Sequence, residues 1–186
     1  MIEIRIQGRG GQGAVVASKV MASAFFKQGK WVQAFPSFGA ERRGAPVAAY
    51  TRVDDREITL RCSVRNPNHL IVLDENLTRN ADIAQGLKDG GWIVINSEKD
   101  PKEFSFPPQF HVATVDASGI AIRHGLGSKG TPIVSTVVLG AFARATGLLK
   151  LSKVLEAIRE NVPVSINQNV AGAKEAYQRV KREKSE

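Results

Sequence analysis

The chain has 186 residues and a mass of 20.2 kDa, the size of one ordinary domain, and we expect that domain to span residues 1–186. Its composition, 42% hydrophobic and 24% charged, is typical of a globular protein that buries a core. Its single cysteine, Cys62, excludes an internal disulfide and a self-contained iron–sulfur cluster, which takes four thiolates as a rule.

The net charge of +8 at pH 7 is concentrated near the start of the chain. Residues 1–65 hold eleven Lys and Arg against five Asp and Glu, whereas residues 66–186 hold fifteen against thirteen. This imbalance indicates an anionic partner: a phosphorylated cofactor, an acidic protein surface or nucleic acid. Aromatic residues are 6% of the chain and do not interleave with arginines, so we expect no nucleic-acid partner.

Nothing in the sequence predicts a membrane partner. The longest apolar runs, at 69–73 and 133–143, are shorter than the roughly 20 residues that cross a bilayer. The first six residues alternate charged and apolar side chains, which is not the pattern of a secretory signal peptide. We therefore expect a soluble, cytoplasmic protein.

The first quarter of the chain predicts a strand, a glycine-rich turn, a helix and a second strand. Apolar residues alternate with polar ones over 2–6, which indicates a strand with one apolar face and one charged face. The helix is expected over 14–27, ended by Gly29, and the second strand over 31–35. Together they form a βαβ-like unit.

The rest of the chain alternates strand and helix patterns. Two short strand patterns flank Asp54-Asp55-Arg56, which is the spacing of an antiparallel hairpin. The expected elements are strands at 47–53, 57–62, 69–73, 92–95 and 110–115, and helices at 76–88, 133–146, 151–161 and 171–184, the last of them basic. This order predicts an α/β fold: a single Rossmann-like three-layer domain with a mixed β-sheet.

A glycine-rich turn, Gly8-Arg-Gly-Gly-Gln-Gly13, lies between the first strand and the first helix. Such a turn brings backbone amides close to an anion at a helix N-terminus, as in dinucleotide-binding folds. Those folds place an acid near the end of the second strand to hold the ribose, and residues 31–37 contain none, so we do not expect NAD. The alternative is that these glycines serve only the tight turn and the packing of helix on strand.

The loop at 36–46 is the most distinctive stretch of the sequence. It follows the second strand, where α/β proteins place ligand contacts, and carries three consecutive charges, Glu41, Arg42 and Arg43. An arginine fork suits a carboxylate or a phosphate. The alternative is a solvated loop in which Glu41 pairs with a neighbouring arginine.

The sequence offers no nucleophile–base pair, Walker lysine or metal-spaced cluster, so we expect no catalytic and no metal-binding residue. We interpret His69, His111 and His124 as structural, the last in a helix beside Arg123. Asp74 follows a buried strand, where an acid can face a site, but capping of the next helix is the commoner role and is the one expected here. Cys62 is expected in a strand as a small buried side chain. The chain thus has the features of one component of a larger enzyme.

Four segments together resemble the gamma subunit of 2-oxoacid:ferredoxin oxidoreductases, the family of pyruvate:ferredoxin oxidoreductase. They fall in order over most of the chain: Gly8-Arg-Gly-Gly-Gln-Gly13, Pro36-Ser-Phe-Gly-Ala-Glu-Arg-Arg-Gly44, Val72-Leu-Asp74 and Leu139-Gly-Ala-Phe-Ala-Arg-Ala-Thr-Gly147. The combination of the first two is far more specific than either alone. The resemblance implies that residues 1–186 form the gamma-type domain of that family.

Membership would imply an assembly that oxidatively decarboxylates a 2-oxoacid, with pyruvate the first candidate, to an acyl-CoA and passes electrons to ferredoxin. The family's alpha- and beta-type chains hold thiamine diphosphate, and its delta and beta chains carry iron–sulfur clusters. This chain alone would bind none of these cofactors and would be inactive in isolation. The resemblance and the basic charge make the following residues candidates for cofactor contact, with coenzyme A first: Gly8, Arg9, Gly10, Gly11, Gln12, Gly13, Ser37, Glu41, Arg42 and Arg43.

The sequence departs from the family pattern at two places. Ala45 stands where the family loop commonly has a second glycine, and Ser135-Thr136 where it often has Asn, which would shift a contact to a partner or substrate. Three different functions also stay open. The smaller subunit of indolepyruvate:ferredoxin oxidoreductase shares the fold, so the 2-oxoacid is not determined. A free-standing nucleotide-binding oxidoreductase is the second possibility, and a basic nucleic-acid binder is the third.

Overall fold

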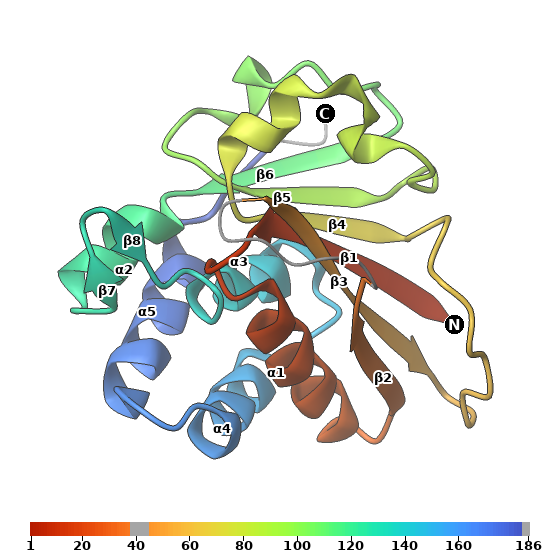
Figure 1. Ribbon diagram of the computed structural model, residues 1–186, viewed down its shortest axis with the longest axis horizontal. Helices are drawn as coiled ribbons and strands as arrows, with labels where there is room; N and C mark the ends of the chain where they lie inside the picture. The colour runs from red at the N-terminus through yellow and green to blue at the C-terminus, as the bar shows by residue number, and fades with distance from the viewer. Residues whose placement is uncertain (38–44, 184–186) are drawn as a thin grey trace.

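The computed structural model describes residues 1–37 and 45–183. Its main sheet has seven strands in the order β2-β3-β1-β4-β5-β6-β9 (Figure 1). The strands are β1 Ile2–Arg9, β2 Trp31–Pro36, β3 Pro46–Asp54, β4 His69–Val72, β5 Trp92–Asn96, β6 His111–Val115 and β9 Lys181–Arg182, and a separate small pair is formed by β7 Gly127–Ser128 and β8 Thr131–Pro132.

The sheet is mixed, as expected, because β3 lies between β1 and β2. β3 pairs antiparallel with both of these strands, whereas β1, β4, β5 and β6 run parallel to one another. The expected βαβ-like start of the fold is therefore present, with one strand inserted between its two parallel strands. The α/β class and the Rossmann-like layered arrangement are confirmed.

The hairpin expected between 47–53 and 57–62 is wrong. Both edges of β3 are already paired, with β1 and with β2, so no edge remains for residues 57–62. This segment is instead irregular and mostly exposed, and it lies against the outer face of the sheet, where the Gln33 side chain donates to the Ile58 carbonyl at 3.0 Å. The antiparallel pairing that the sequence predicted is thus made by other strands.

The α-helices gather on one face of the sheet (Figure 1). They are α1 Ala14–Phe26, α2 Ala117–Arg123, α3 Val137–Thr146, α4 Leu151–Asn161 and α5 Ile166–Arg179. The bounds of α4 are those expected from the sequence, whereas α3 begins later than expected, at Val137, and α5 is shifted toward the N-terminus relative to 171–184. No helix within the described ranges has the length and the apolar character that crossing a bilayer needs.

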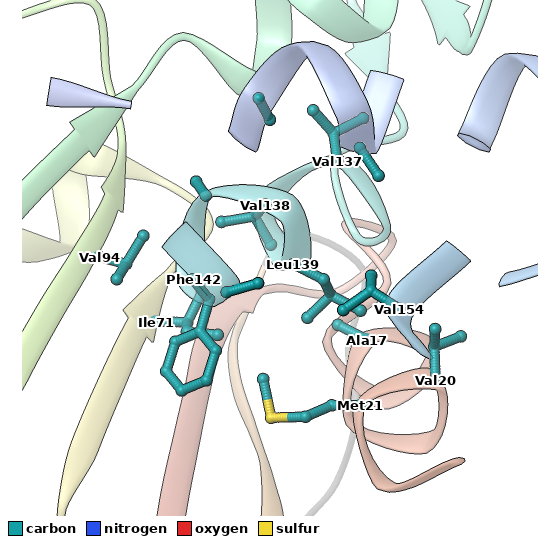
Figure 2. Packing of buried hydrophobic residues seen from close by; sticks show 14 of the residues in the cluster. Ala17, Val20, Met21, Ile71, Val94, Val137, Val138, Leu139, Phe142 and Val154 are labelled. Atoms are coloured by element: carbon teal, nitrogen blue, oxygen red, sulfur yellow. The ribbon is translucent and has the colours of Figure 1, made fainter. Parts of the chain in front are cut away.

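The main core lies between this helical layer and the sheet. Figure 2 shows the Phe142 ring of α3 beside Ile71 of β4, with Val94 of β5 to the upper left and Met21 of α1 to the lower right. All four side chains are fully buried. The apolar stripe of α3 is thereby held between the parallel strands and α1.

The opposite face of the sheet is covered by 3₁₀ turns and loops. η1 Glu75–Arg79, η2 Ala81–Ala84 and η3 Pro101–Glu103 form this layer, and a second apolar cluster under it includes Leu70, Ile93 and Phe110. The continuous helix expected over 76–88 is wrong. Asn80 has an extended backbone and its side chain accepts from the Asp82 amide, so it ends η1 and starts a separate turn.

Glu3, on the charged face of β1, is paired within the chain. Arg52 on β3 is 1% exposed, and its Nε donates to the Glu3 carboxylate at 2.9 Å. It also donates to the Cys62 carbonyl at 2.7 Å. Arg52 therefore holds the 55–64 segment against this face of the sheet.

His69 is structural, and burial makes it a source of pH-dependent stability. Burial lowers its pKa from 6.5 to about 4, while its Nδ1 accepts from the Trp92 amide at 3.1 Å. Between pH 4 and 6.5 the unfolded chain binds the proton first, so stability falls as the pH decreases through this window. Across this window, protonation of His69 alone should lower the free energy of unfolding by about 2–3 kcal/mol.

The His69→Asn variant tests this prediction, since an amide oxygen keeps an acceptor for Trp92 but does not titrate. Denaturant unfolding at a series of pH values measures the free energy of unfolding. Between pH 6.5 and 4 this free energy should fall less steeply for the variant than for the parent. The matched control is His111→Asn at an exposed histidine, for which the free energy of unfolding should fall with decreasing pH as steeply as in the parent. The same pH dependence of the free energy of unfolding for the parent and His69→Asn would contradict the claim that His69 causes this loss of stability.

Candidate functional site

The carboxyl ends of five strands meet at one edge of the sheet. β1, β2, β4, β5 and β6 all run in the same direction, because β3 is antiparallel to both of its neighbours. In open α/β sheets, ligands bind in crevices at this edge. The glycine-rich turn after β1 and the loop that follows β2 both start here.

The glycine-rich turn is held by its own hydrogen bonds. The Gln12 side chain accepts from the Arg9 amide at 2.7 Å, and the Gly10 amide donates to the Ala45 carbonyl at 2.9 Å. Gly13 has a φ of 83° and a Cβ there would lie 2.9 Å from Ser135 Cβ. The turn therefore needs glycine at 13 both for its backbone angle and for the close approach of the segment before α3.

Several amides of this turn remain without an acceptor among the described residues. They belong to Gly11, Gly13, Ala14, Val15 and Val16, at the start of α1. Within residues 1–37 and 45–183, no side chain caps this helix, and its first turn carries no acid. Free amides and the positive end of the helix dipole together favour an anion at this position.

A crevice of about 450 Å³ opens next to the turn, between the ends of β1, β4, β5 and β6. Gln12 lies at one side of it and Asp74, just after β4, at the other. Arg9 Nε donates to Asp74 Oδ2 at 2.7 Å. Partial burial raises the pKa of Asp74, but hydrogen bonds from Arg9 and Asn76 outweigh it, so the pKa lies below its ordinary value. Asp74 is thus an ionised anchor for Arg9, and it also caps η1 as expected.

The far wall of the crevice carries a second charged group. Ser97 and Lys99, after β5, both donate to the Glu75 carboxylate, and these contacts lower the pKa of Glu75 although partial burial opposes them. Glu75, Asn96, Ser97 and Asp116 line this crevice and are not among the residues predicted from the sequence. One signal was present: a polar pair or an acid lies just after each of the apolar strands β4, β5 and β6.

The predicted site residues divide into three groups. Gly8 to Gly13 all lie at the carboxyl edge, with Gln12 in the crevice. Ser37, at the end of β2, donates its amide to Ala48 and faces the outer side of the sheet. Glu41, Arg42 and Arg43 lie outside the described residues, in a segment whose described ends, Ser37 and Ala45, are at this same edge.

Other chemically notable side chains have structural surroundings. The interpretation of Cys62 as a buried strand residue is wrong, because this residue is exposed and lies in the irregular segment next to Arg52. His124 ends α2 and contacts Glu175 of α5 at 2.7 Å. Within residues 1–37 and 45–183, no group of three or more metal-ligating side chains comes together.

A protein-family comparison identifies the chain on the basis of nearly its whole length. Residues 3–179 match the family model described as pyruvate ferredoxin/flavodoxin oxidoreductase. The chain belongs to this family. Among curated relatives, the pyruvate/ketoisovalerate oxidoreductases common subunit gamma of Thermococcus kodakarensis is 48% identical over 183 residues, which cover 95% of this chain and 96% of the relative. Pyruvate synthase subunit PorC of Methanothermobacter thermautotrophicus is 46% identical, covering 98% and 97% of the two chains.

A solved relative shows the same fold. The crystal structure of the pyruvate oxidoreductase subunit PORC of Thermotoga maritima superposes with a TM-score of 0.82, at 35% identity, over 98% of each chain. The assignment to gamma subunits of 2-oxoacid:ferredoxin oxidoreductases, which are oxidoreductase complexes, is confirmed. A free-standing nucleotide-binding oxidoreductase and a nucleic-acid binder do not fit this membership.

The pair Ser135-Thr136, where the sequence resemblance predicts a departure from the family pattern, lies just before α3. Ser135 packs against Gly13, directly beside the free amides. Thr136 is buried and its hydroxyl donates to Asn169 of α5 at 2.6 Å. Ser135 is therefore the residue of this pair that adjoins the glycine-rich turn, whereas Thr136 ties α3 to α5.

Proposed function

We propose that this chain is the gamma subunit of a pyruvate-oxidising complex, in which it helps to hold coenzyme A at the carboxyl edge of its sheet. The complex converts the 2-oxoacid to an acyl-CoA and passes electrons to ferredoxin. The chain acts in the cytoplasm as a single domain over residues 1–186, beside alpha-, beta- and delta-type subunits. The smaller subunit of indolepyruvate:ferredoxin oxidoreductase is the alternative, because nothing in the described residues recognises one 2-oxoacid.

The observation that carries the proposal is the row of free amides at the start of α1, next to the crevice. Coenzyme A carries a diphosphate and a 3′-phosphate, and phosphates are the groups that such a helix start binds best. The excess of basic residues within 1–65 adds a favourable field. Candidate contacts are therefore Gly8 to Gly13, Ser37, Glu41, Arg42 and Arg43.

The other cofactors of the complex are assigned to the other subunits, because the part of this chain that the structure describes does not offer the side chains that would hold them. The described residues provide no metal cluster, and one cysteine cannot hold an iron–sulfur centre. Thiamine diphosphate, which supplies the decarboxylation chemistry, and the clusters that carry electrons therefore belong to the other subunits. This chain's residues bind and orient the acyl acceptor, and the isolated chain is inactive.

A pair of variants at Gly11 tests the phosphate contact. A Cβ at this position meets no atom of the described residues within 4 Å, so a short side chain fits among them, although the φ of 98° strains any residue other than glycine. Gly11→Asp and Gly11→Asn share this strain and differ in charge alone. Calorimetry of coenzyme A with the assembled complex is expected to show affinity at least about tenfold weaker for Asp than for Asn. Equal affinities for the two variants would exclude a phosphate at the turn.

Charge reversal at Arg42 and Arg43 tests the loop in the same complex. We expect weaker binding of coenzyme A with an unchanged affinity for the 2-oxoacid, because the reversal places two carboxylates near the phosphates. Arg159→Glu, at an exposed position on α4, is the matched control and leaves the affinity unchanged. Coenzyme A affinity unaltered by the double reversal would remove these two arginines from the site.

A further inference from the structure

A cavity of about 420 Å³ lies on the outer face of the sheet, on the side of β1 away from α1. Its floor is formed by β1 and β3, and its wall by the η1 and η2 turns. Apolar atoms come from Val47, Tyr50, Leu77 and Ile83. The volume lies within the range of small-molecule pockets.

Arg5 and Gln7 both line this cavity from β1, since residues two apart on a strand share a face. The sheet register places Arg5 between Tyr50 and Leu70, and Gln7 between Ala48 and Val72. Both polar side chains therefore stand in a row of mainly apolar neighbours. Such a position is costly for polar groups that lack partners.

The hydrogen bonds of these two side chains are incomplete. Arg5 donates from one terminal nitrogen to the Ile83 carbonyl at 2.6 Å and to the Gln85 carbonyl at 3.2 Å. Its Nε is buried without a partner among the described residues, and so is Gln7 Oε1. Two adjacent groups on one cavity floor thus lack the contacts that buried polar atoms normally make.

The charge of Arg5 also lacks a counterion in the part of the chain that the structure describes. No carboxylate there lies within 4 Å of it, and Asp82, which lines the cavity, is exposed and makes no ion pair with it. Burial lowers the pKa of Arg5, which reflects the cost of this uncompensated charge. A guanidinium in such surroundings is stabilised most by a carboxylate, and the Gln7 amide N–H, which makes no hydrogen bond within the described residues, is a second donor on the same face.

We propose that this cavity binds the carboxylate of a small organic acid, held by the Arg5 guanidinium and the Gln7 amide N–H, with the apolar part of the acid against Tyr50, Leu77 and Ile83. The cavity is several times larger than an acidic side chain needs, which favours a free acid over a carboxylate of a partner subunit. The site uses Arg5 and Gln7, neither of which is a proposed coenzyme A contact, although Gly8 and Ser37, which are, also border the cavity. It therefore does not depend on the proposed coenzyme A contact.

Calorimetry with the full chain tests the site, with hexanoate as the probe and hexanamide as its neutral counterpart. We expect saturable binding of hexanoate and at least about tenfold weaker binding of hexanamide. Arg5→Met and Gln7→Leu should each weaken hexanoate binding at least about tenfold. Arg159→Met, which removes an exposed arginine on α4, should leave it unchanged.

Gln7→Leu keeps the test decisive if Arg5→Met fails to fold, because no hydrogen bond in the described structure depends on the Gln7 side chain. No saturable hexanoate binding, or binding that both variants retain, would overturn the proposal. The titration is then repeated on the assembled complex. Binding in the complex supports a free acid, whereas binding by the chain alone would assign the contact to a partner's carboxylate and overturn the free-acid assignment.

Discussion

Gly140→Ala is expected to destabilise the chain by about 3 kcal/mol or more, since it forces two packed helices apart. Gly140 is buried on α3, and a Cβ there would lie 1.9 Å from the carbonyl oxygen of Ala173 on α5. The obstacle is helix backbone, which cannot rotate away as a side chain would. In thermal unfolding, a chain of this size should lose about 6–12 °C in melting temperature.

Gly172→Ala is the matched control, because it makes the same substitution on the facing helix. A Cβ at this position would lie 3.0 Å from Val137 Cγ2, the end of a side chain that has some freedom to move. Alanine also favours the helix over glycine by about 1 kcal/mol, so the net change should be small. Similar losses for the two variants would show that α3 and α5 are not in backbone contact at Gly140.

Arg52→Met is the second change with a large expected effect, because it leaves the Glu3 carboxylate in a largely buried position without its cation. Arg52 is 1% exposed, and it binds both Glu3 and the Cys62 carbonyl. Breaking a buried ion pair on one side costs about 3–5 kcal/mol. The 55–64 segment should also detach from the sheet, so trypsin should cut faster at Arg56 and Arg61.

The double variant Glu3→Gln/Arg52→Met separates the two contributions. Removal of the unpaired charge should restore part of the stability lost in Arg52→Met, whereas trypsin should still cut rapidly because the Cys62 contact is still missing. Denaturant unfolding measures the first effect and timed digestion the second. Additive losses of stability would contradict a direct Glu3–Arg52 interaction.

Much of the fold follows from local patterns in the sequence. The alternation at Ile2, Ile4 and Ile6 gives β1 its buried and polar faces, and the apolar runs of β4, β5 and β6 are buried on both sides. α4 occupies the expected residues, because its apolar stripe is clear. Such patterns predict which side chains of an element are buried, and the structure buries those side chains.

The pairing of β3 could not be predicted in this way. Its position between β1 and β2 depends on contacts between residues far apart in the sequence. The apolar side chains of Ile58 and Leu60 predicted a strand, but with both edges of β3 occupied they have no partner strand. Asn80 likewise interrupts the expected helix over 76–88 with a local hydrogen bond that competes with helix formation.

The candidate site was predicted in part. The Gly8–Gly13 turn lies at the carboxyl edge, as strand–turn–helix order predicts, and an anion at its free amides stays a prediction. The crevice acids Asp74 and Glu75 could not be assigned to it, since the order of the strands decides which of their ends meet. The alternating pattern predicted that β1 has a polar face. It could not predict the cavity that Arg5 and Gln7 line on that face, because β3 and the η1 and η2 turns form the rest of it.

Purification of this chain from its native source through a mild affinity tag, under anaerobic conditions, tests the central claim most directly. We expect alpha-, beta- and delta-type chains to come with it, together with bound thiamine diphosphate and the broad visible absorption of iron–sulfur clusters. The preparation should form acyl-CoA from a 2-oxoacid, and a panel of 2-oxoacids names the substrate. A clean 20.2 kDa species without partners or chromophore would contradict the assignment of this chain to a multi-subunit oxidoreductase.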